Sequence, residues 1–303
     1  MGLNTATDAR QTSRDGPGMW SRVEPYVYIA PAFLFVVIFL LYPAAYTLYI
    51  SFTKWDGLNP PEFIGLGNYI QMFNETVFGT SLLNTLIWVV ATLIFPVGLG
   101  LMLAVFVNRI PLQGFYKAIF YLPYAISATS VAVIWTFMLS PTGVINEGLR
   151  AIGLDALAQP WLMKPPLNTL SMLMAFTWQT TGTNMILFLV GLQGIPPDPI
   201  EAAKLDGASG WQTFRHVIMP LLRPITVVVI TIAVVNSFKV FDLIWVMTQG
   251  GPYRSSETLA VTMYRESFVL FRLGFGAAIA NFLSLIAIVF AVVYLRSVFQ
   301  PED

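Results

Sequence analysis

The sequence contains no cysteine and a single histidine, His216. Without cysteine the chain forms neither disulfides nor thiolate metal sites, and one histidine excludes an all-histidine metal site. Charge is also scarce: 11% of the 303 residues are charged, whereas about a quarter are charged in a soluble globular domain. The formal net charge is zero and no long basic run occurs, which argues against nucleic acid as a partner.

Apolar residues make up 56% of the chain, and the mean hydropathy is positive. A helix that crosses the hydrocarbon core needs about 20 apolar residues, because each residue rises about 1.5 Å and the core is about 30 Å thick. Six segments satisfy this requirement: residues 26–52, 81–107, 115–139, 168–192, 222–247 and 275–298. This pattern predicts an all-α, polytopic membrane protein with six transmembrane helices.

The spans predict the organisation of the chain. A cytoplasmic N-terminal tail (1–25) precedes the first transmembrane helix (26–52) and an external loop (53–80), and a five-helix core (81–298) precedes a C-terminal tail (299–303). The first segment is too long for the apolar region of a signal peptide and lacks a small-residue cleavage site, so it is expected to be retained.

The distribution of lysine and arginine bears on the orientation. With both termini in the cytoplasm, nine of the sixteen basic residues face inward and six face outward, while Lys239 lies within a span. The excess agrees with the positive-inside rule. Arg254, Arg265 and Arg272 lie together between the last two spans and oppose the rule, so charge alone supports this orientation only modestly.

Proline interrupts the second and third predicted spans. Pro96 interrupts the second span and Pro123 lies early in the third. Each removes a backbone hydrogen bond and favours a bend. Curved helices can enclose a cavity, but proline is also common in membrane helices that merely pack against neighbours, and both interpretations are open at this point.

Residues 195–220 are the most polar long stretch within the hydrophobic region. Asp198 is suited to the N-cap of a helix, Pro199 to its first position, and Glu201 has the capping-box spacing from Asp198. The first short helix should therefore run to about Asp206. Gly207 is then expected to provide a C-cap or a tight turn.

A second short helix is predicted after this turn. Ser209 and Gln212 repeat the capping-box spacing, and the helix should reach about Ile218. Small side chains in the loop allow a partner to approach closely: Ala202, Ala203 and Ala208. The residues alone also fit an amphipathic connector that lies flat on the membrane surface.

The spacing of Glu201-Ala202-Ala203, Gly207 and Val217-x-Met219-Pro220 resembles the EAA loop of ABC importer permeases, with Val for Ile and Met for Leu. The resemblance implies that loop 196–220 is cytoplasmic and forms a coupling helix that docks into a groove of an ATPase subunit. The residues expected to carry this coupling are Glu201, Ala202, Ala203, Asp206, Gly207, Ala208, Phe214 and Pro220.

Further motifs resemble the sugar-permease branch of this family over nearly the whole chain. They are Tyr42-Pro43, Ser51-Phe52-Thr53-Lys54-Trp55, residues 63–69, Tyr121-Leu122-Pro123, Trp135, Pro141, Gly143, Asn146, residues 191–196, Phe241-Asp242 and residues 248–252. The two extra N-terminal helices and large external domain of the maltose subunit have no counterpart here, so maltose is not assumed.

The resemblance implies a type I ABC importer permease fold in a bacterial inner membrane, with both termini cytoplasmic. It also implies four kinds of partner: a second homologous permease, two ATPase subunits, an extracytoplasmic sugar-binding protein and the carbohydrate. ATP and magnesium are expected on the ATPases, with no cofactor in this chain.

Polar side chains within the membrane are costly unless they face a partner or a cavity, so they mark candidate positions on a transport path. The candidates are Trp178, Thr181, Asn184, Asn236, Ser237, Lys239, Asp242, Trp245 and Asn281. Amides, hydroxyls and aromatic faces suit a neutral sugar. Lys239 and Asp242, three residues apart, can neutralise each other or meet the partner permease, and a structural ion pair is preferred over substrate contact. For Asn184 and Asn236, helix-to-helix hydrogen bonding and sugar contact stay open.

The chain has no Gly-x-x-x-x-Gly-Lys-Ser/Thr phosphate loop, so it is expected to be a non-catalytic subunit. The nearest alternative is an ABC permease for glycerol phosphate, an amino acid or phosphate, but an anionic solute would need unpaired basic residues, and only Lys239 qualifies. A secondary transporter or channel would need intramembrane carboxylates, of which Asp242 is the one candidate. A membrane-embedded enzyme lacks a set of catalytic groups within the spans.

Overall fold

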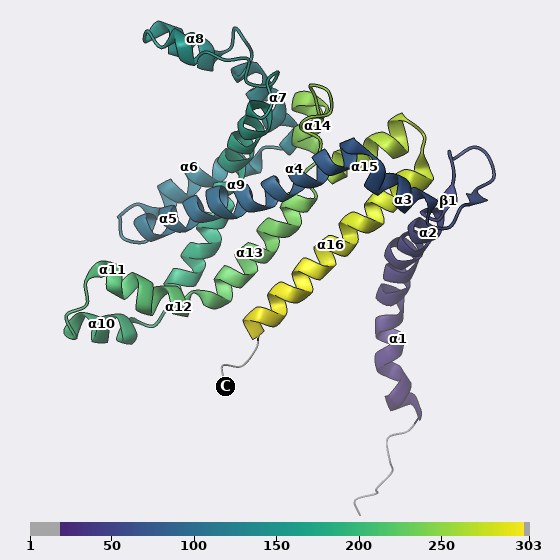
Figure 1. The fold of residues 1–303 in the computed structure, drawn as a ribbon. Helices are drawn as coiled ribbons and strands as arrows, with labels where there is room; N and C mark the ends of the chain where they lie inside the picture. The colour runs from purple at the N-terminus through teal and green to yellow at the C-terminus, as the bar shows by residue number, and fades with distance from the viewer. Residues whose placement is uncertain (1–18, 300–303) are drawn as a thin grey trace, which may run out of the picture. The chain divides into compact units, whose positions relative to one another are not determined.

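The computed structural model describes residues 19–299 of the chain, which divides into two compact units at Tyr49 (Figure 1). The described part of the first unit is one helical run, which continues to Ile50: α1 (Met19–Val36), the π-helical turn η1 (Val37–Leu41) and α2 (Tyr42–Ile50). This helix begins before the predicted start at residue 26, because helical hydrogen bonding continues beyond the apolar stretch. The predicted tails fall largely outside the described residues, at 1–18 and 300–303.

The first helical run exposes apolar side chains from Tyr26 to Tyr49. Residues Tyr26–Ile50 have a mean hydropathy of 2.3, and none of the apolar window is buried. Aromatic rings one turn apart stack along it, with centroids 5.7 Å apart for Phe35 and Phe39 and 6.4 Å apart for Tyr42 and Tyr46. The run therefore has the surface of a helix that lies among lipids or against another chain.

The second unit begins with a small hairpin, in which β1 (Thr53–Lys54) pairs antiparallel with β2 (Glu62–Phe63). Within it, Asp56 accepts hydrogen bonds from the backbone N–H groups of Asn59 and Leu58 and from the Asn59 amide, which lower the pKa of Asp56 to about 2. The hairpin leads into α3 (Gly67–Asn74).

The second predicted span is one continuous helical run, α4 (Thr76–Thr92), the π-helical turn η2 (Leu93–Val97) and α5 (Gly98–Val107). Pro96 lies within η2. Proline cannot donate a backbone hydrogen bond, and the wider π-helical turn accommodates this loss. Pro96 therefore marks a local change in helix type rather than a break.

The third predicted span, 115–139, is wrong as a single helix. It consists of α6 (Gln113–Ala125) and α7 (Ala128–Met138), which meet at 92°. Ser127 caps α7 by accepting a hydrogen bond from the Ser130 N–H, and the Gln179 amide donates to the Ile126 carbonyl at 3.1 Å. Because these side chains replace the missing backbone partners, the chain can turn sharply here.

The fifth predicted span, 222–247, is also broken. It consists of α13 (Arg223–Phe238) and α14 (Asp242–Thr248), separated by residues 239–241. The remaining elements are α8 (Val144–Ala151), the 3₁₀ turn η3 (Asp155–Leu157), α9 (Leu167–Gln193), α10 (Pro197–Leu205), α11 (Gly210–Thr213), η4 (Phe214–Ile218), α12 (Met219–Leu221), α15 (Leu259–Tyr264), η5 (Arg265–Val269) and α16 (Leu273–Phe299). The α9 and α16 helices match the fourth and sixth predicted spans closely.

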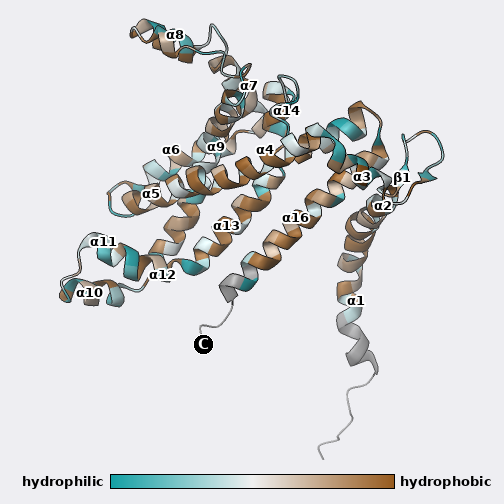
Figure 2. Ribbon diagram, viewed as in Figure 1, coloured by the Kyte–Doolittle hydropathy of each residue, from teal (hydrophilic) through white to brown (hydrophobic). Residues whose placement is uncertain are grey.

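Three described helical runs are long and apolar enough to cross a membrane: Tyr26–Ile50, Thr76–Val107 and Leu273–Tyr294. Two bent pairs, α6 with α7 and the 210–221 run with α13, bring the total to five if each pair counts as one span. The six-span count thus stays a prediction. Figure 2 shows apolar residues along α4, α5, α13 and α16, with hydrophilic residues in the loops.

The α9 helix packs closely against α5 and α6. A Cβ atom added at Gly182 would lie 1.8 Å from the Phe120 carbonyl oxygen, and one added at Gly100 would lie 2.6 Å from the Asn184 Cβ. Both contacts are shorter than atoms tolerate, so these positions require glycine. The close approach brings α5, α6 and α9 together around the pocket described below.

We expect Gly182→Ala to lower the stability of the folded protein, because the new methyl group forces α6 away from α9. Overpacking of this kind costs about 1–3 kcal/mol. Thermal unfolding in detergent or nanodiscs measures the change. Gly79→Ala is the matched control, since nothing lies within 4 Å of a Cβ atom there. Equal unfolding temperatures for both variants would contradict the close packing.

Candidate functional site

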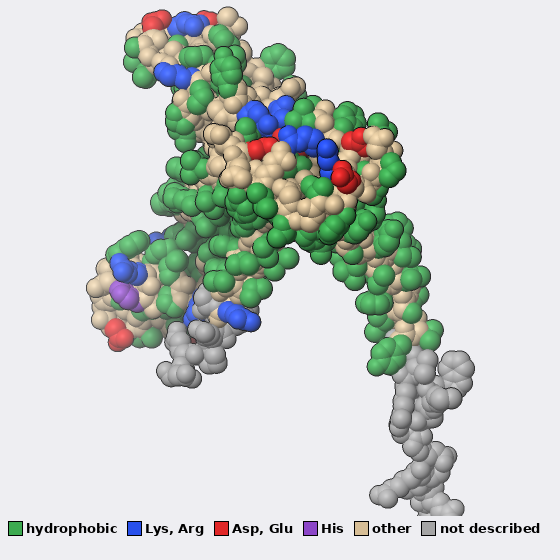
Figure 3. Space-filling view, turned by 45° about the vertical axis from the view of Figure 1, so that its right-hand side comes forward, with side chains coloured by type: hydrophobic (Ala, Val, Ile, Leu, Met, Phe, Trp, Pro, Cys, Tyr) green, Lys and Arg blue, Asp and Glu red, His purple; other side chains and the backbone are tan. Residues whose placement is uncertain are grey.

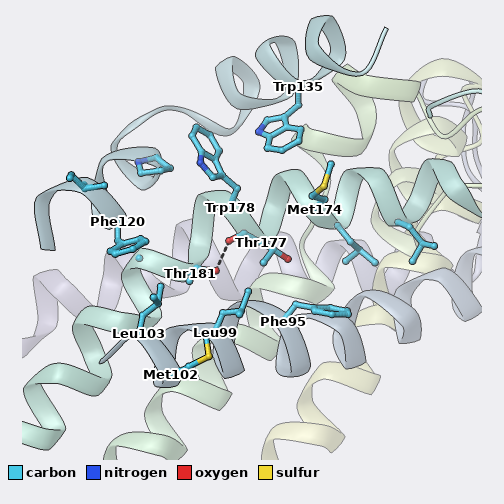
Figure 4. Close-up of a pocket in the computed structure, with 15 residues that line it drawn as sticks. Phe95, Leu99, Met102, Leu103, Phe120, Trp135, Met174, Thr177, Trp178 and Thr181 are labelled. Atoms are coloured by element: carbon cyan, nitrogen blue, oxygen red, sulfur yellow. Dashed lines mark hydrogen bonds between the residues drawn. The ribbon is translucent and has the colours of Figure 1, made fainter. Parts of the chain in front are cut away.

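A pocket of about 730 Å³ lies between α5, α6, α7 and α9 (Figure 4). The bend between α6 and α7 places Trp135 over the pocket, while α9 contributes Thr177, Trp178 and Thr181. Its other lining residues are predominantly apolar: Phe95, Leu99, Met102, Leu103, Ile119, Phe120, Pro123, Leu170, Leu173, Met174 and Gly182. The volume lies within the range of ligand sites, about 300–1,000 Å³.

The polar and aromatic groups of this pocket have defined partners. The Trp135 and Trp178 rings meet edge to face with centroids 6.0 Å apart. The Thr181 hydroxyl donates to the Thr177 carbonyl at 2.6 Å. Trp178 is 41% exposed, so part of its indole is accessible for contact with a solute. The pocket therefore offers aromatic surface and few hydrogen-bonding groups.

Two of the nine predicted path residues, Trp178 and Thr181, line this pocket. Asn184, on the next turn of α9, is buried, and its side chain makes no hydrogen bond within residues 19–299. Ser237 is buried and donates to the Val234 carbonyl, and Asn281 is half-buried on α16. The predicted set thus does not form one site.

Trp245 lies in a separate aromatic cluster near the end of α14. Its ring centroid is 5.7 Å from that of Phe241 and 4.9 Å from that of Tyr264. The Arg265 guanidinium lies 5.3 Å from the Trp245 centroid in a cation–π contact. These contacts account for Trp245 without a solute.

The sequence-based preference for an ion pair between Lys239 and Asp242 is wrong. Both residues and Asn236 are exposed, and neither charge has an ion pair or a side-chain hydrogen bond in the part of the chain that the structure describes. Because the helix is broken at 239–241, the side chains of Lys239 and Asp242 do not lie on a common helical face. Lys239 instead lies at the C-terminal end of α13, where the helix dipole favours a cation.

The loop 195–220 folds as two short helices that meet at a glycine turn. Gly207 has φ of +79°, and the Ala208 N–H donates to the Ala203 carbonyl at 2.9 Å. The predicted capping box of the second helix is confirmed: Ser209 accepts from the Gln212 N–H, and the Gln212 side chain accepts from the Ser209 N–H. Helical structure then continues through η4 and α12 to Leu221.

The predicted cap of the first helix is wrong. The helix begins at Pro197, and Pro196 occupies the N-cap without a side-chain hydrogen bond. Pro196 and Pro197 precede Asp198, and their fixed φ favours a helix that begins before Asp198. The Asp198 carboxylate therefore lies inside the helix and is not at the N-cap. Asp198 lies in the first turn instead, and Glu201 is exposed.

The α10 helix carries no buried residue. Ala202, Asp206 and Gly207 are exposed with Glu201, Leu205 is 89% exposed, and Ala203, Ala208 and Phe214 are half-buried; Pro220 is exposed beyond them. The surface of this helix is therefore accessible to another protein. The element thus has the shape expected of a docking loop.

A network of charges that sequence analysis missed orders the segment between α14 and α16. Glu257 and Glu266 are fully buried, and each pairs with two arginines: Arg254 lies 2.9 Å from Glu257 and 3.1 Å from Glu266, Arg265 lies 2.6 Å from Glu257, and Arg272 lies 3.3 Å from Glu266. In Figure 3, basic and acidic side chains form a patch in the upper middle of the view, and further charged side chains lie at its upper left and lower left.

This network explains the three arginines that oppose the positive-inside rule. Arg272 also pairs with Glu75 at 3.0 Å, so three arginines meet three carboxylates. Burial by itself would lower the pKa of Arg254, but the hydrogen bonds and charges of Glu257 and Glu266 outweigh burial and hold that pKa above its usual range. The arginines are therefore structural and bear little on orientation.

Residues 96–302 match the family described as binding-protein-dependent transport system inner membrane component. The chain belongs to this family. The permease is thus a multi-pass component of the inner membrane, and its expected role as a non-catalytic subunit is confirmed by this membership. The EAA-type loop identified from the sequence is typical of the family.

Curated relatives match almost the whole permease. A probable ABC transporter permease protein of Pyrococcus horikoshii is 36% identical over 92% of this chain and 97% of its own length. The sn-glycerol-3-phosphate transport system permease protein of Agrobacterium fabrum is 32% identical over 92% and 95%. The arabinooligosaccharides transport system permease protein of Bacillus subtilis is 30% identical over 91% and 88%.

The fold matches a solved structure. The crystal structure of a bacterial ABC transporter involved in the import of the acidic polysaccharide alginate gives a TM-score of 0.81 at 24% identity, and covers 94% of this chain and 99% of the other. The all-α, polytopic fold expected from the sequence is confirmed, and the type I importer permease fold fits it.

We expect Glu257→Gln to destabilise the permease, because the change leaves Arg254 and Arg265 without their buried carboxylate. Removing one partner of a buried ion pair costs about 3–5 kcal/mol. Glu147→Gln is the control, since the Glu147–Arg150 pair is exposed and such pairs contribute about 0–1 kcal/mol. Unfolding of both variants in detergent measures the difference, and similar stabilities would show that the network is dispensable.

Proposed function

We propose that the permease is a membrane-spanning subunit of an ATP-driven importer that couples closure of ATPase subunits to the passage of a neutral di- or oligosaccharide. The observation that carries this proposal is the loop 195–220, an exposed pair of short helices with a defined glycine turn. A helix with no buried residue, held in place at both ends, is suited to receive force from a partner.

The connection from this loop to the spans supports a mechanical role. The helical run Gly210–Leu221 meets α13 at 72°, and α13 ends at the break 239–241. A displacement of the loop therefore acts on a helix that is already interrupted. Together with the 92° bend of α6 and α7, this break supplies two places where a transport path can open or close by rigid movement of helix segments.

Aromatic surface in the pocket and available amides support a sugar substrate. Sugars pack their apolar ring faces on aromatic side chains and bond their hydroxyls to amides. Trp135 and Trp178 provide the first within the pocket. Asn184 and Asn236 lie outside the pocket lining and make no side-chain hydrogen bonds within residues 19–299, so they are amides available elsewhere along a path. Relatives named for lactose and arabinooligosaccharides, 31% and 30% identical, agree with this class.

A second candidate substrate is glycerol phosphate. Lys239, which is exposed and has no ion pair among residues 19–299, is the observation that favours an anion, and the relative named for sn-glycerol-3-phosphate is 32% identical. Asp242 follows three residues later and would repel a phosphate. We therefore place the neutral sugar first.

The proposal includes the other subunits of such an importer. A second homologous permease and two ATPases that bind ATP and magnesium would complete the complex, and an external sugar-binding protein would deliver the substrate. The uncovered Tyr26–Ile50 run supplies surface for the second permease and for lipid. Both termini are placed in the cytoplasm, together with the coupling loop.

We expect Glu201→Ala and Gly207→Pro to uncouple ATP hydrolysis from uptake. The first removes an exposed carboxylate of the docking helix, and the second cannot adopt the φ of +79° at the turn. Uptake and ATPase rates of the assembled complex in proteoliposomes measure the effect. Asp198→Ala, an exposed carboxylate of the same helix without a capping bond, should change little. Full uptake in both test variants would refute the coupling role.

Lys239→Gln separates the two candidate substrates. Loss of a charged hydrogen bond costs about 1.5–3 kcal/mol, so an anionic substrate would lose about 10- to 100-fold in kcat/KM. We expect a smaller change for a neutral sugar, and a rise in its KM when Trp178→Ala removes the accessible indole. Concentration-dependent uptake of labelled sugars and of glycerol 3-phosphate distinguishes the cases. A selective loss of glycerol 3-phosphate uptake in Lys239→Gln would reverse the order of the candidates.

A further inference from the structure

A second groove, of about 410 Å³, lies between the C-terminal half of α5 and the beginning of the second helix of the loop 195–220. The α5 helix contributes Leu101, Met102, Val105 and Phe106, and the loop contributes Trp211 and Phe214. Met102 also lines the transport pocket. This groove therefore adjoins the proposed path but opens beside the coupling loop.

The groove lies where a membrane span ends. The α4–α5 run has a mean hydropathy of 2.5 and ends at Val107. Trp211 is 66% exposed, and its ring lies 5.7 Å from that of Phe214. An exposed tryptophan beside the end of a membrane helix is typical of the boundary between hydrocarbon and lipid headgroups.

Charge at the groove has one sign. Arg109 is the one charged residue that lines it, and no carboxylate is among its lining residues. The Arg109 side chain is exposed and makes no ion pair or side-chain hydrogen bond with any part of the chain from 19 to 299. The groove is thus an apolar trough that ends at an unpaired cation.

We propose that this groove, called here the lipid groove, binds an anionic phospholipid. An acyl chain would lie along Leu101 and Val105, the phosphate would pair with Arg109, and Trp211 would lie at the headgroup boundary. Basic pockets between membrane helices bind anionic headgroups by the same combination of contacts. A sugar would find almost no hydrogen-bonding side chain here, and a cationic segment would be repelled by Arg109.

The position of the lipid groove has a consequence for regulation. Because Trp211 and Phe214 belong to the loop 195–220, a bound lipid would contact the element that transmits ATPase closure. That consequence rests on the proposed function, whereas the lipid site itself does not. Binding can therefore be tested without measuring transport.

The test measures lipid retention by the assembled transporter. Native mass spectrometry compares phosphatidylglycerol with phosphatidylcholine of equal chain length on wild type, Arg109→Gln and Arg215→Gln. Arg215 is an exposed cation on the same loop outside the groove, so it is the matched control. We expect wild type and Arg215→Gln to prefer phosphatidylglycerol, and Arg109→Gln to lose about fivefold of that preference, the effect of one basic residue at an anionic surface.

Tryptophan quenching provides a second measurement that does not depend on Arg109. Brominated phosphatidylglycerol should quench wild-type fluorescence more than that of Trp211→Phe, and the difference isolates Trp211. An equal preference for phosphatidylglycerol in Arg109→Gln and Arg215→Gln would overturn the proposal. Absence of quenching at Trp211 in the assembled complex would also overturn it, because a partner subunit then covers the groove. Displacement of the lipid by inorganic phosphate alone would also overturn it, in favour of a free-anion site.

Discussion

A backbone that crosses hydrocarbon must satisfy its own N–H and C=O groups, because no water is present to do so. This requirement governs the permease wherever its chain leaves helical structure. Buried amide side chains donate to the carbonyls that are released there: Asn68 to Ser51 and Thr53, Asn84 to Ser255 and Glu257, Asn168 to Gly251, and Gln179 to Ile126. Each amide joins segments that are distant in the sequence, so the same bonds also hold the fold together.

The sharp turns that these bonds permit shape the pocket between α5, α6, α7 and α9. The turn between α6 and α7 places Trp135 opposite Trp178, and the contact of Gly182 with the Phe120 carbonyl lets α6 lie close to α9. A straight third span would leave these aromatic rings apart. The geometry that a transporter needs for a solute is thus a product of interrupted helices rather than of continuous ones.

The buried charges perform a related task at one end of the second unit. Glu257 accepts from Arg254, Arg265 and the Thr262 hydroxyl, and its backbone carbonyl accepts from Asn84. Separating a buried carboxylate from this many hydrogen-bond and ion-pair partners costs much free energy. The segment between α14 and α16 is therefore anchored to α4, while the loop at residues 195–220 is left exposed. This contrast suits a permease with one rigid region and one that receives a partner.

Sequence by itself determined the apolar segments, the family and the turn at Gly207 with its Ser209–Gln212 capping box, because each depends on composition or on residues a few positions apart. Tertiary structure decided the rest. The bend between α6 and α7 depends on Gln179, which is 53 positions from Ile126, and the arginines between α14 and α16 find carboxylates as far away as Glu75. Lys239 and Asp242 have helical spacing but do not pair, because the backbone leaves the helix between them. Local spacing predicts a contact only where the helix continues, and whether it continues is settled by distant side chains.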